Sequence, residues 1–241
     1  PAVPLDRYRA HLAELGQEFA VVLGSDTADV EAAAEALVEV LHRRHGYVGD
    51  SLTYDDPQNA NLIRVIDRRK GLPVALGILY MHAARSHGIT ADGLAFPGHF
   101  LIGITAGGRR LLLDPFNGGR TVDAATMRQL LKSLGGETTE LSPAHHRPVP
   151  TRSVLLRLQN NVKIRALNVG DTARAAECLR AMTALSPDEA GLWFELGEVE
   201  TRAGNLSAAI AAFESAREVE TDARLKLRLA EVISSLRRRL N

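Results

Sequence analysis

One histidine and one aspartate are spaced so that a hairpin would bring them together for acid–base or charge-stabilising chemistry. His99 precedes one run of alternating apolar residues, Asp114 ends a second run, and the segment 106–108, Ala-Gly-Gly, separates the two. A turn centred on residues 106–107 places the two side chains directly opposite each other, and a turn centred on residues 107–108 makes them diagonal neighbours. In both registers their Cβ atoms lie within about 8 Å. Asp114 can therefore orient the imidazole of His99 and favour its protonated form, as the acidic member of a catalytic triad does.

A triad also needs a nucleophile, and the residues that could supply one are poorly placed. The single cysteine, Cys178, lies on a helix predicted to be packed, well outside the segment that holds the pair. Hydroxyl groups that could reach a cleft beside the pair lie in no motif that would activate them; they belong to Ser51, Thr53, Tyr54 and Tyr80. We therefore do not expect catalysis by the usual nucleophilic mechanism.

A predicted helix start supplies the third part of this candidate site. The tripeptide Gly-Leu-Pro at 71–73 precedes an apolar stretch, and proline suits the first position of a helix, where its missing N–H costs nothing. The helix is expected to run from Pro73 to a stop at Gly88. Its first N–H groups, those of Val74 and the two residues after it, would point into the cleft and attract a negatively charged group.

Three asparagines are further candidates for binding a ligand. Asn59 and Asn61 lie in a segment expected to border the cleft, although loop and helix-cap hydrogen bonds would explain them equally well. Asn117 follows Asp114 closely in the sequence. A metal site made of His82 with the histidine–aspartate pair is a further alternative. A histidine on an otherwise apolar helix is more often a core residue, however, so we expect neither a metal nor a cofactor.

The bulk composition is that of an ordinary soluble globular protein. The chain has 241 residues, 45% hydrophobic and 24% charged, which is enough for one large domain or two modest ones. Its 29 basic and 29 acidic side chains cancel, so we expect no nucleic-acid binding. One cysteine excludes an internal disulfide and any zinc site with two thiolates. There is neither an apolar run of about 20 residues nor a signal-peptide pattern. We therefore expect a cytoplasmic protein without membrane association.

Local periodicity predicts a helical beginning, a central hairpin and a helical end. The predicted elements before residue 151 are, in chain order, helices within 1–46 with a second start capped by Ser25 and Asp26, a loop over 47–61, a short helix through Arg69 capped by Asn59 or Asn61, the helix from Pro73, an antiparallel hairpin within 91–116, a helix near Ala124–Leu134, and a linker or extended crossing segment over 137–150.

After Pro150 the chain is predicted to be helical, and it repeats. Gly170-Asp171 and Gly204-Asn205 are 34 residues apart, which is the period of the tetratricopeptide repeat. The second unit has bulky and small residues at the positions that this motif requires: Trp193, Leu196, Gly197, Ala209, Phe213 and Ala216. We expect the repeats to bind a protein or peptide partner.

Several segments together resemble the transglutaminase and papain-like superfamily, in bacterial proteins that join a transglutaminase-like core to tetratricopeptide repeats. A similar core occurs in certain eukaryotic F-box proteins. The resemblance covers roughly residues 47–120 and rests on Tyr-Asp-Asp-Pro-Gln-Asn-Ala-Asn-Leu at 54–62, Arg-Lys-Gly-Leu-Pro at 69–73, the Arg-x-x-Gly-Ile ending at 85–89, Phe-Pro-Gly-His-Phe-Leu at 96–101 and Asp-Pro-Phe-Asn-Gly-Gly at 114–119.

The resemblance implies that Pro73 stands where such enzymes have their nucleophilic cysteine. In this branch of the superfamily Gly-x-Pro takes the place of Gly-x-Cys, while His99 and Asp114 correspond to the other two members of the triad. The resemblance thus implies a repurposed site that has lost its thiol and kept its cleft.

We therefore predict an α+β fold: a transglutaminase/papain-like core with a helical N-terminal segment over residues 1–150, followed by an all-α tetratricopeptide-repeat region over 151–241. The predicted function is non-catalytic binding of a peptide, an amide or a small anionic ligand. The predicted ligand-binding residues are Asn59, Asn61, Pro73, Val74, His99, Asp114 and Asn117. One alternative is a hydrolase or acyl-transfer enzyme that uses His99 and Asp114 with water or a metal. Another is a pure scaffold. The sequence leaves the oligomeric state open.

Overall fold

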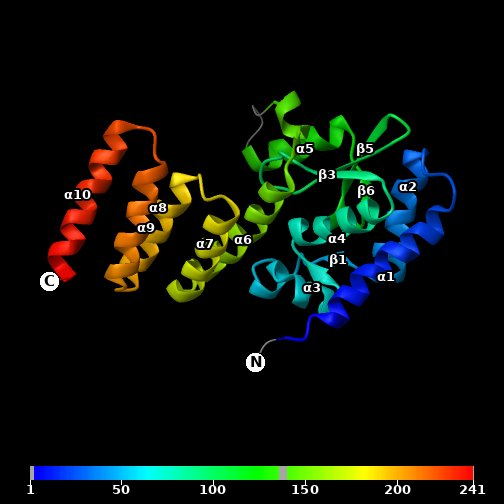
Figure 1. Cartoon of the computed structure of the whole chain (residues 1–241). Helices are drawn as coiled ribbons and strands as arrows, with labels where there is room; N and C mark the ends of the chain where they lie inside the picture. Colours follow the sequence, from blue (N-terminus) through cyan, green and yellow to red (C-terminus); the bar gives the residue numbers. More distant parts are fainter. Residues whose placement is uncertain (1–2, 136–139, 241) are drawn as a thin grey trace. The chain divides into compact units, whose positions relative to one another are not determined.

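The structure, a computed structural model, describes residues 3–135 and 140–240 and divides into two compact units, Pro1–Val154 and Leu155–Asn241 (Figure 1). Helix α6 (Thr151–Asn168) contains the point of division, so the domain boundary predicted at residue 150 stays a prediction. The predicted α+β class is confirmed, because the chain is mainly helical and its first unit contains a small antiparallel sheet.

The first unit begins with two helices. Helix α1 spans Asp6–Leu23, and α2 (Val30–Leu37) continues into a π-helical turn, η1 (Val38–Arg44). The side chain of Asp29 caps α2 by accepting hydrogen bonds from the N–H groups of Glu31 (2.8 Å) and Ala32 (3.2 Å). The predicted cap at Ser25-Asp26 is therefore wrong. Asp29 has the extended backbone that an N-cap needs, whereas the residues just before it form turns.

Four short elements lead to the central helix α4 (Pro73–Ser86). They are η2 (Pro57–Ala60), α3 (Leu62–Arg68) and a parallel pair of strands, β1 (Val48–Gly49) with β2 (Lys70–Gly71). Asn61 caps α3, so of the two predicted caps, Asn59 and Asn61, the second is confirmed. Pro73 takes the first turn of α4, as predicted, and the helix is buried along most of its length.

The sheet has five strands in the order β6-β5-β4-β3-β7. Their bounds are β3 Thr90–Leu94, β4 Ile102–Ala106, β5 Arg109–Asp114, β6 Arg120–Thr121 and β7 Pro148–Val149. Strands β4 and β5 pair Ala106 with Arg109, so the turn is Gly107-Gly108. Both glycines have positive φ, at 54° and 77°, as a two-residue hairpin of this kind requires. The second of the two predicted registers is thereby confirmed.

Strand β7 shows that the segment before the second unit is part of the fold. It pairs with β3 at the edge of the sheet. An edge strand tolerates Pro148, because the side of the strand that faces away from the sheet needs no backbone N–H. For Pro148–Val149 the interpretation as a linker is therefore wrong, and the alternative, an extended crossing segment, is confirmed. Residues 136–139 lie outside the described residues. Helix α5 (Ala124–Gly135) and the short turns η3 (Pro115–Asn117) and η4 (Pro143–His146) complete this unit.

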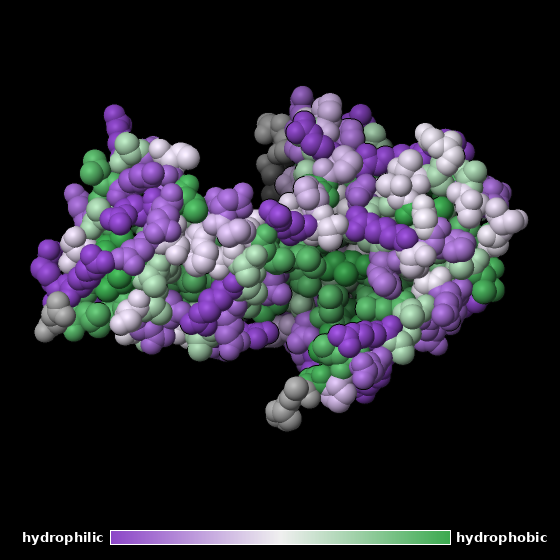
Figure 2. Space-filling view, in the orientation of Figure 1, coloured by the Kyte–Doolittle hydropathy of each residue, from purple (hydrophilic) through white to green (hydrophobic). Residues whose placement is uncertain are grey.

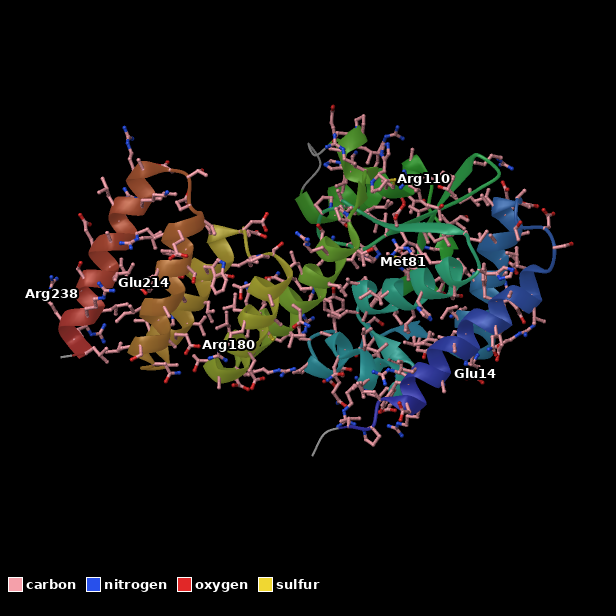
Figure 3. All side chains as sticks on the ribbon, viewed as in Figure 1. Glu14, Met81, Arg110, Arg180, Glu214 and Arg238 are labelled. Atoms are coloured by element: carbon pink, nitrogen blue, oxygen red, sulfur yellow. The ribbon has the colours of Figure 1, made fainter. Side chains whose placement is uncertain are left out.

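The second unit is a series of antiparallel helices. Helices α7 (Thr172–Leu185), α8 (Ala190–Arg202), α9 (Leu206–Val219) and α10 (Ala223–Leu240) each pack on the next (Figure 1). Gly197 lets the ring of Phe213 pack directly on α8, because an added Cβ would meet that ring at 2.7 Å. The buried carboxylate of Glu200 accepts hydrogen bonds from Arg180 (labelled in Figure 3) and Asn205. Hydrophilic side chains cover much of the visible face, and hydrophobic ones show between them (Figure 2).

In neither of the described ranges, 3–135 and 140–240, is a helix long and apolar enough to cross a membrane.

Candidate functional site

The hairpin brings His99 and Asp114 into direct contact. The Nε2 atom of His99 lies 2.9 Å from Oδ1 of Asp114. Asp114 ends β5 and has no exposed side-chain surface, whereas 15% of the His99 side chain is exposed. The pair predicted from the turn geometry therefore forms, with its carboxylate inside the protein and its imidazole reaching toward solvent.

Several donors hold the carboxylate of Asp114 in place. Its Oδ1 also accepts from the N–H groups of Phe116 (3.1 Å) and Asn117 (3.3 Å), and its Oδ2 accepts from the side-chain amide of Asn117 at 2.7 Å. Arg120 Nη2 lies 3.9 Å from Oδ2. Burial by itself raises the pKa of Asp114, but the hydrogen bonds and charge of His99, together with Asn117, bring this pKa below its ordinary value. The carboxylate is thus ionised at neutral pH, and His99 donates to it through Nε2–H.

Aromatic rings form one wall beside His99. The ring of Phe116 lies edge-on to the imidazole, with centroids 6.1 Å apart and an interplanar angle of 89°. Tyr54 packs on Phe116 in turn, at 5.9 Å. Gly49 makes room for this arrangement, because an added Cβ would come within 2.6 Å of the Phe116 ring. The imidazole is therefore held in plane by its carboxylate and against one face by an aromatic side chain.

Helix α4 packs against residues that flank the pair. Gly77 allows the ring of Phe100 to pack on the helix, since an added Cβ would meet that ring at 2.4 Å. Phe100 follows His99 directly, and η3 after Asp114 also packs on α4. The N-cap residue Leu72 supplies no side-chain cap. Its carbonyl accepts from the N–H of Leu76 at 3.0 Å, so the prediction that Leu76 has a free N–H is wrong. Of the three N–H groups predicted to be available to a ligand, those of Val74 and Ala75 remain.

Asn59 and Asn61 have structural partners. Asn59 is fully buried; its amide nitrogen donates to the Thr53 carbonyl (2.7 Å), and its amide oxygen accepts from Arg68 (3.1 Å). Asn61 caps α3. Arg68 also reaches Asp50 (3.2 Å). Hydrogen bonds from Thr53 lower the pKa of Asp50 to about 2. The role of the two asparagines in ligand binding stays a prediction, and their hydrogen bonds hold the 50–61 loop.

A cavity of about 430 Å³ lies beside the loop that follows Asp114, and the sequence did not predict it. Its wall includes Asn117 and Arg120, which also approach Asp114, and His42 of η1. Nδ1 of His42 lies 3.2 Å from the Tyr47 carbonyl and donates to it, and Nε2 lies beside Gly118. No spacing signal identified His42, because it looks like any polar residue on an N-terminal helix.

Tyr80 adds a buried hydroxyl behind the same loop. Its side chain is fully buried, and its hydroxyl has no hydrogen-bond partner among the described residues. The hydroxyl lies next to Gly119, where an added Cβ would meet it at 2.9 Å. Burial and the nearby charge of Asp114 both raise the pKa of Tyr80, which favours the neutral phenol over the phenolate.

The remaining chemical candidates lie apart from the pair. Nε2 of His82 lies 3.1 Å from the backbone carbonyl of Leu12 on α1, which fits the core interpretation. Cys178 is buried in α7 of the second unit, and burial raises the pKa of its thiol. Within residues 3–135 and 140–240, no group of three or more His, Cys, Asp or Glu side chains is arranged to hold a metal.

Comparisons with known proteins agree with both halves of this description. Residues 6–160 match the family model of the transglutaminase-like superfamily, and residues 162–235 match that of the tetratricopeptide repeat. The chain is similar to a protein of Xylella fastidiosa (strain 9a5c) named UPF0162 protein, with 34% identity over 72% of this chain and 63% of the relative. This chain therefore spans less than two thirds of that relative.

Two further relatives extend the comparison. A UPF0162 protein of Vibrio cholerae serotype O1 is 30% identical over 78% of this chain and 70% of its own length. F-box only protein 21 of Mus musculus is 30% identical over 34% of this chain and 13% of its own length. The resemblance to a transglutaminase-like core joined to tetratricopeptide repeats is confirmed, and the similarity extends to an F-box protein. The correspondence of Pro73 with the nucleophilic cysteine stays a prediction.

The unpartnered hydroxyl of Tyr80 gives a stability prediction. Removing it in Tyr80→Phe is expected to leave the free energy of unfolding unchanged or to raise it by about 1 kcal/mol, because a buried hydroxyl without a partner costs desolvation energy. The matched control is Tyr47→Phe, whose hydroxyl lies 2.9 Å from Nε2 of His11. It is expected to lower stability by about 1 kcal/mol. Urea unfolding of both variants measures the difference, and a clear loss in Tyr80→Phe would show that its hydroxyl has a partner in solution.

The lowered pKa of Asp114 gives a pH prediction. A carboxyl group whose pKa is lower in the folded state stabilises the fold at pH values above 3.8, its pKa in the unfolded chain. This stabilisation is lost as the pH falls through the lower pKa of the folded state. In His99→Ala the pair is absent, and burial then favours the protonated acid. The gap in unfolding free energy between wild type and His99→Ala is therefore expected to narrow as pH falls from about 5 to 3. Urea unfolding at several pH values tests this, and a constant gap would contradict it.

Proposed function

The chain belongs to the transglutaminase-like superfamily, and from that premise we propose that it is a non-catalytic member in which His99 and Asp114 bind a peptide amide or a small anionic group, while the repeats bind a protein partner. The observation that carries this proposal is Pro73 in the first turn of α4. The resemblance puts the nucleophilic cysteine of the superfamily at that residue. Proline has no nucleophilic side chain, whereas the helix start remains attractive to negative charge.

The geometry of the pair supports binding in a defined way. Asp114 holds His99 through Nε2, so Nδ1 is the nitrogen through which the imidazole would act on a bound group. Neutral His99 would accept from an amide N–H there, and protonated His99 would donate to a carboxylate. Asp114 and Asn117 act as positioning residues, because they hold the imidazole and its carboxylate partner. Val74 would add a backbone N–H from the helix start.

One observation favours a second candidate, an enzyme. A buried, ionised aspartate that orients a histidine is the arrangement that makes histidine a general base. His99 could then activate water for hydrolysis or acyl transfer without a side-chain nucleophile, or with a metal. The two candidates differ in one measurable property, which is turnover that depends on His99.

The role proposed for the second unit follows from the repeat itself. Tetratricopeptide repeats generally mediate protein interaction, and stacked helix pairs present extended surfaces suited to binding a polypeptide. We further propose a cytoplasmic location, since the chain's single cysteine is buried and builds no disulfide framework. Nucleic acid and membranes are not part of this proposal.

A substrate and ligand screen tests the proposal. We expect purified protein to show no amidase, esterase or transglutaminase turnover above that of His99→Ala. In a screen of amide and carboxylate fragments, we expect hits to shift the imidazole ¹H–¹⁵N signals of His99, and these hits should not bind His99→Ala. Circular dichroism checks that the variant is folded. Turnover that disappears in His99→Ala would contradict the binding proposal and support the enzyme candidate. A screen without any hit near His99 would support the scaffold alternative.

Restoring the thiol tests the register of the proposed site. In Pro73→Cys the new thiol would stand at a helix start near His99, where its pKa is expected to fall and its reactivity to rise. Alkylation by iodoacetamide at pH 7 is expected to be at least about tenfold faster at the introduced thiol than at Cys178, which is buried and has a raised pKa. The double variant Pro73→Cys/His99→Ala should lose most of this acceleration. A folded single variant whose new thiol reacts no faster than Cys178 would refute the correspondence of Pro73 with the nucleophile.

A further inference from the structure

A groove of about 410 Å³ lies among the last three helices of the second unit. The first turns of α8, the end of α9 and the first half of α10 line it. The lining residues are Ala190, Gly191, Phe194, Ala216, Glu220, Leu225, Arg228, Leu229 and Val232. Most of these side chains are apolar, so the groove is suited to taking apolar groups from another molecule.

The apolar wall of this groove is exposed. Phe194 is 41% exposed, Leu225 is 42% exposed and Val232 is 37% exposed, while Ala216 and Leu229 form a buried floor. Isolated apolar residues on a surface are common, but several that converge on one groove mark a site of interaction. On α10 the three apolar lining positions 225, 229 and 232 follow one face of the helix, so Leu225 and Val232 of the wall flank Leu229 of the floor in one continuous apolar stripe.

The charged residues of α10 indicate what kind of partner the groove would bind. The stretch Ala223–Leu240 has six basic residues and one acidic residue, Glu231. Arg237 pairs with Glu214, which is labelled in Figure 3. Arg228, in the groove wall, has no carboxylate within ion-pair distance among the described residues, and the same holds for two arginines on the same stripe of the helix, Arg224 and Arg239.

The groove wall also contains one carboxylate, that of Glu220, whose Oε1 accepts hydrogen bonds from the backbone N–H groups of Thr221 (2.7 Å) and Asp222 (2.9 Å). Glu231 lies on the same stripe of α10 as the arginines. The three arginines outnumber these two carboxylates, so the groove combines an apolar wall with net positive charge along one edge. A nucleic acid would use the positive charge but not the apolar wall, whereas an amphipathic polypeptide would use both.

We propose that this groove binds an amphipathic helix of a partner protein, with apolar residues at i, i+3 or i+4, and i+7 in the groove and a flanking Asp or Glu on Arg228. The inference rests on the proposed role of the repeats in protein binding and specifies the surface and the chemistry of the partner. Apolar burial supplies affinity, and the contact with arginine sets the orientation of the bound helix.

Gly191 offers a way to close the groove without disturbing the fold. It lies in α8, and no heavy atom is within 4 Å of the position that its Cβ would take. A side chain is therefore tolerated there, and a helix accepts most residues more readily than glycine. Gly191→Leu would place its side chain in the groove, and Gly191→Ala is the matched control. Arg228→Glu reverses the charge at the edge.

The experiment is a selection from a displayed library of helical peptides of about 20 residues on the full chain, with counter-selection on Gly191→Leu. Fluorescence anisotropy of one selected synthetic peptide then gives affinities. The enriched peptides should share the apolar spacing and an acidic flank. Binding should weaken at least about tenfold in Gly191→Leu and in Arg228→Glu, and change less than about twofold in Gly191→Ala. Replacing the peptide's acidic residue by Lys should restore binding to Arg228→Glu.

The contrary outcomes are distinct from one another. Peptides that bind the repeats equally well in Gly191→Leu would overturn the groove and leave the proposed binding role of the repeats intact, whereas a selection that yields no binder would count against both. Enriched peptides without acidic residues would overturn the role of Arg228.

Two results would identify a different occupant of the groove. Self-association that disappears in Gly191→Leu, seen by light scattering, would make a second copy of the chain the occupant. A dT20 oligonucleotide that binds tightly, depends on Arg228 and competes with the peptide would make the edge a nucleic-acid surface.

Discussion

The buried carboxylate of Asp114 is the interaction on which the first unit's site depends. A charge without exposed surface is stable only where donors surround it. Here the donors are the His99 imidazole before β4 and the backbone and side chain of the η3 turn, and the charged Arg120 lies 3.9 Å away. One ionised group therefore joins the segment before β4, the end of β5 and the start of β6, and it orients His99 at the same time.

The residues around Asp114 have different surroundings. His99 is partly exposed and contacts the aromatic ring of Phe116. Asn117 and Arg120 line a cavity that His42 also lines. Asn117 therefore connects this cavity with the buried carboxylate, because its side-chain amide donates to Oδ2 of Asp114.

Residues with short-range signals were predictable, and residues that depend on distant partners were not. The Gly107-Gly108 turn, which requires positive φ, predicted the hairpin and the contact between its ends. The 34-residue period predicted the repeats. The cap of α2 was misplaced because several residues before that helix have suitable side chains, and the backbone conformation of Asp29 decided among them. Strand β7 was missed because its pairing partner, β3, lies more than 50 residues earlier in the chain.

Local sequence patterns were enough to predict a histidine and an aspartate at the two ends of a hairpin, a proline at a helix start, and two-helix repeats. These features depend on local backbone preferences and on periodicity, which act over a few residues. Which groups are buried, partnered or exposed became visible in the folded chain. The tertiary structure placed Asn59 inside a hydrogen-bond network, set His42 and Tyr80 behind the Asp114 loop, and left the wall of the α8–α10 groove open. Burial and partnership arise from side chains that meet across long stretches of chain, so no local pattern records them.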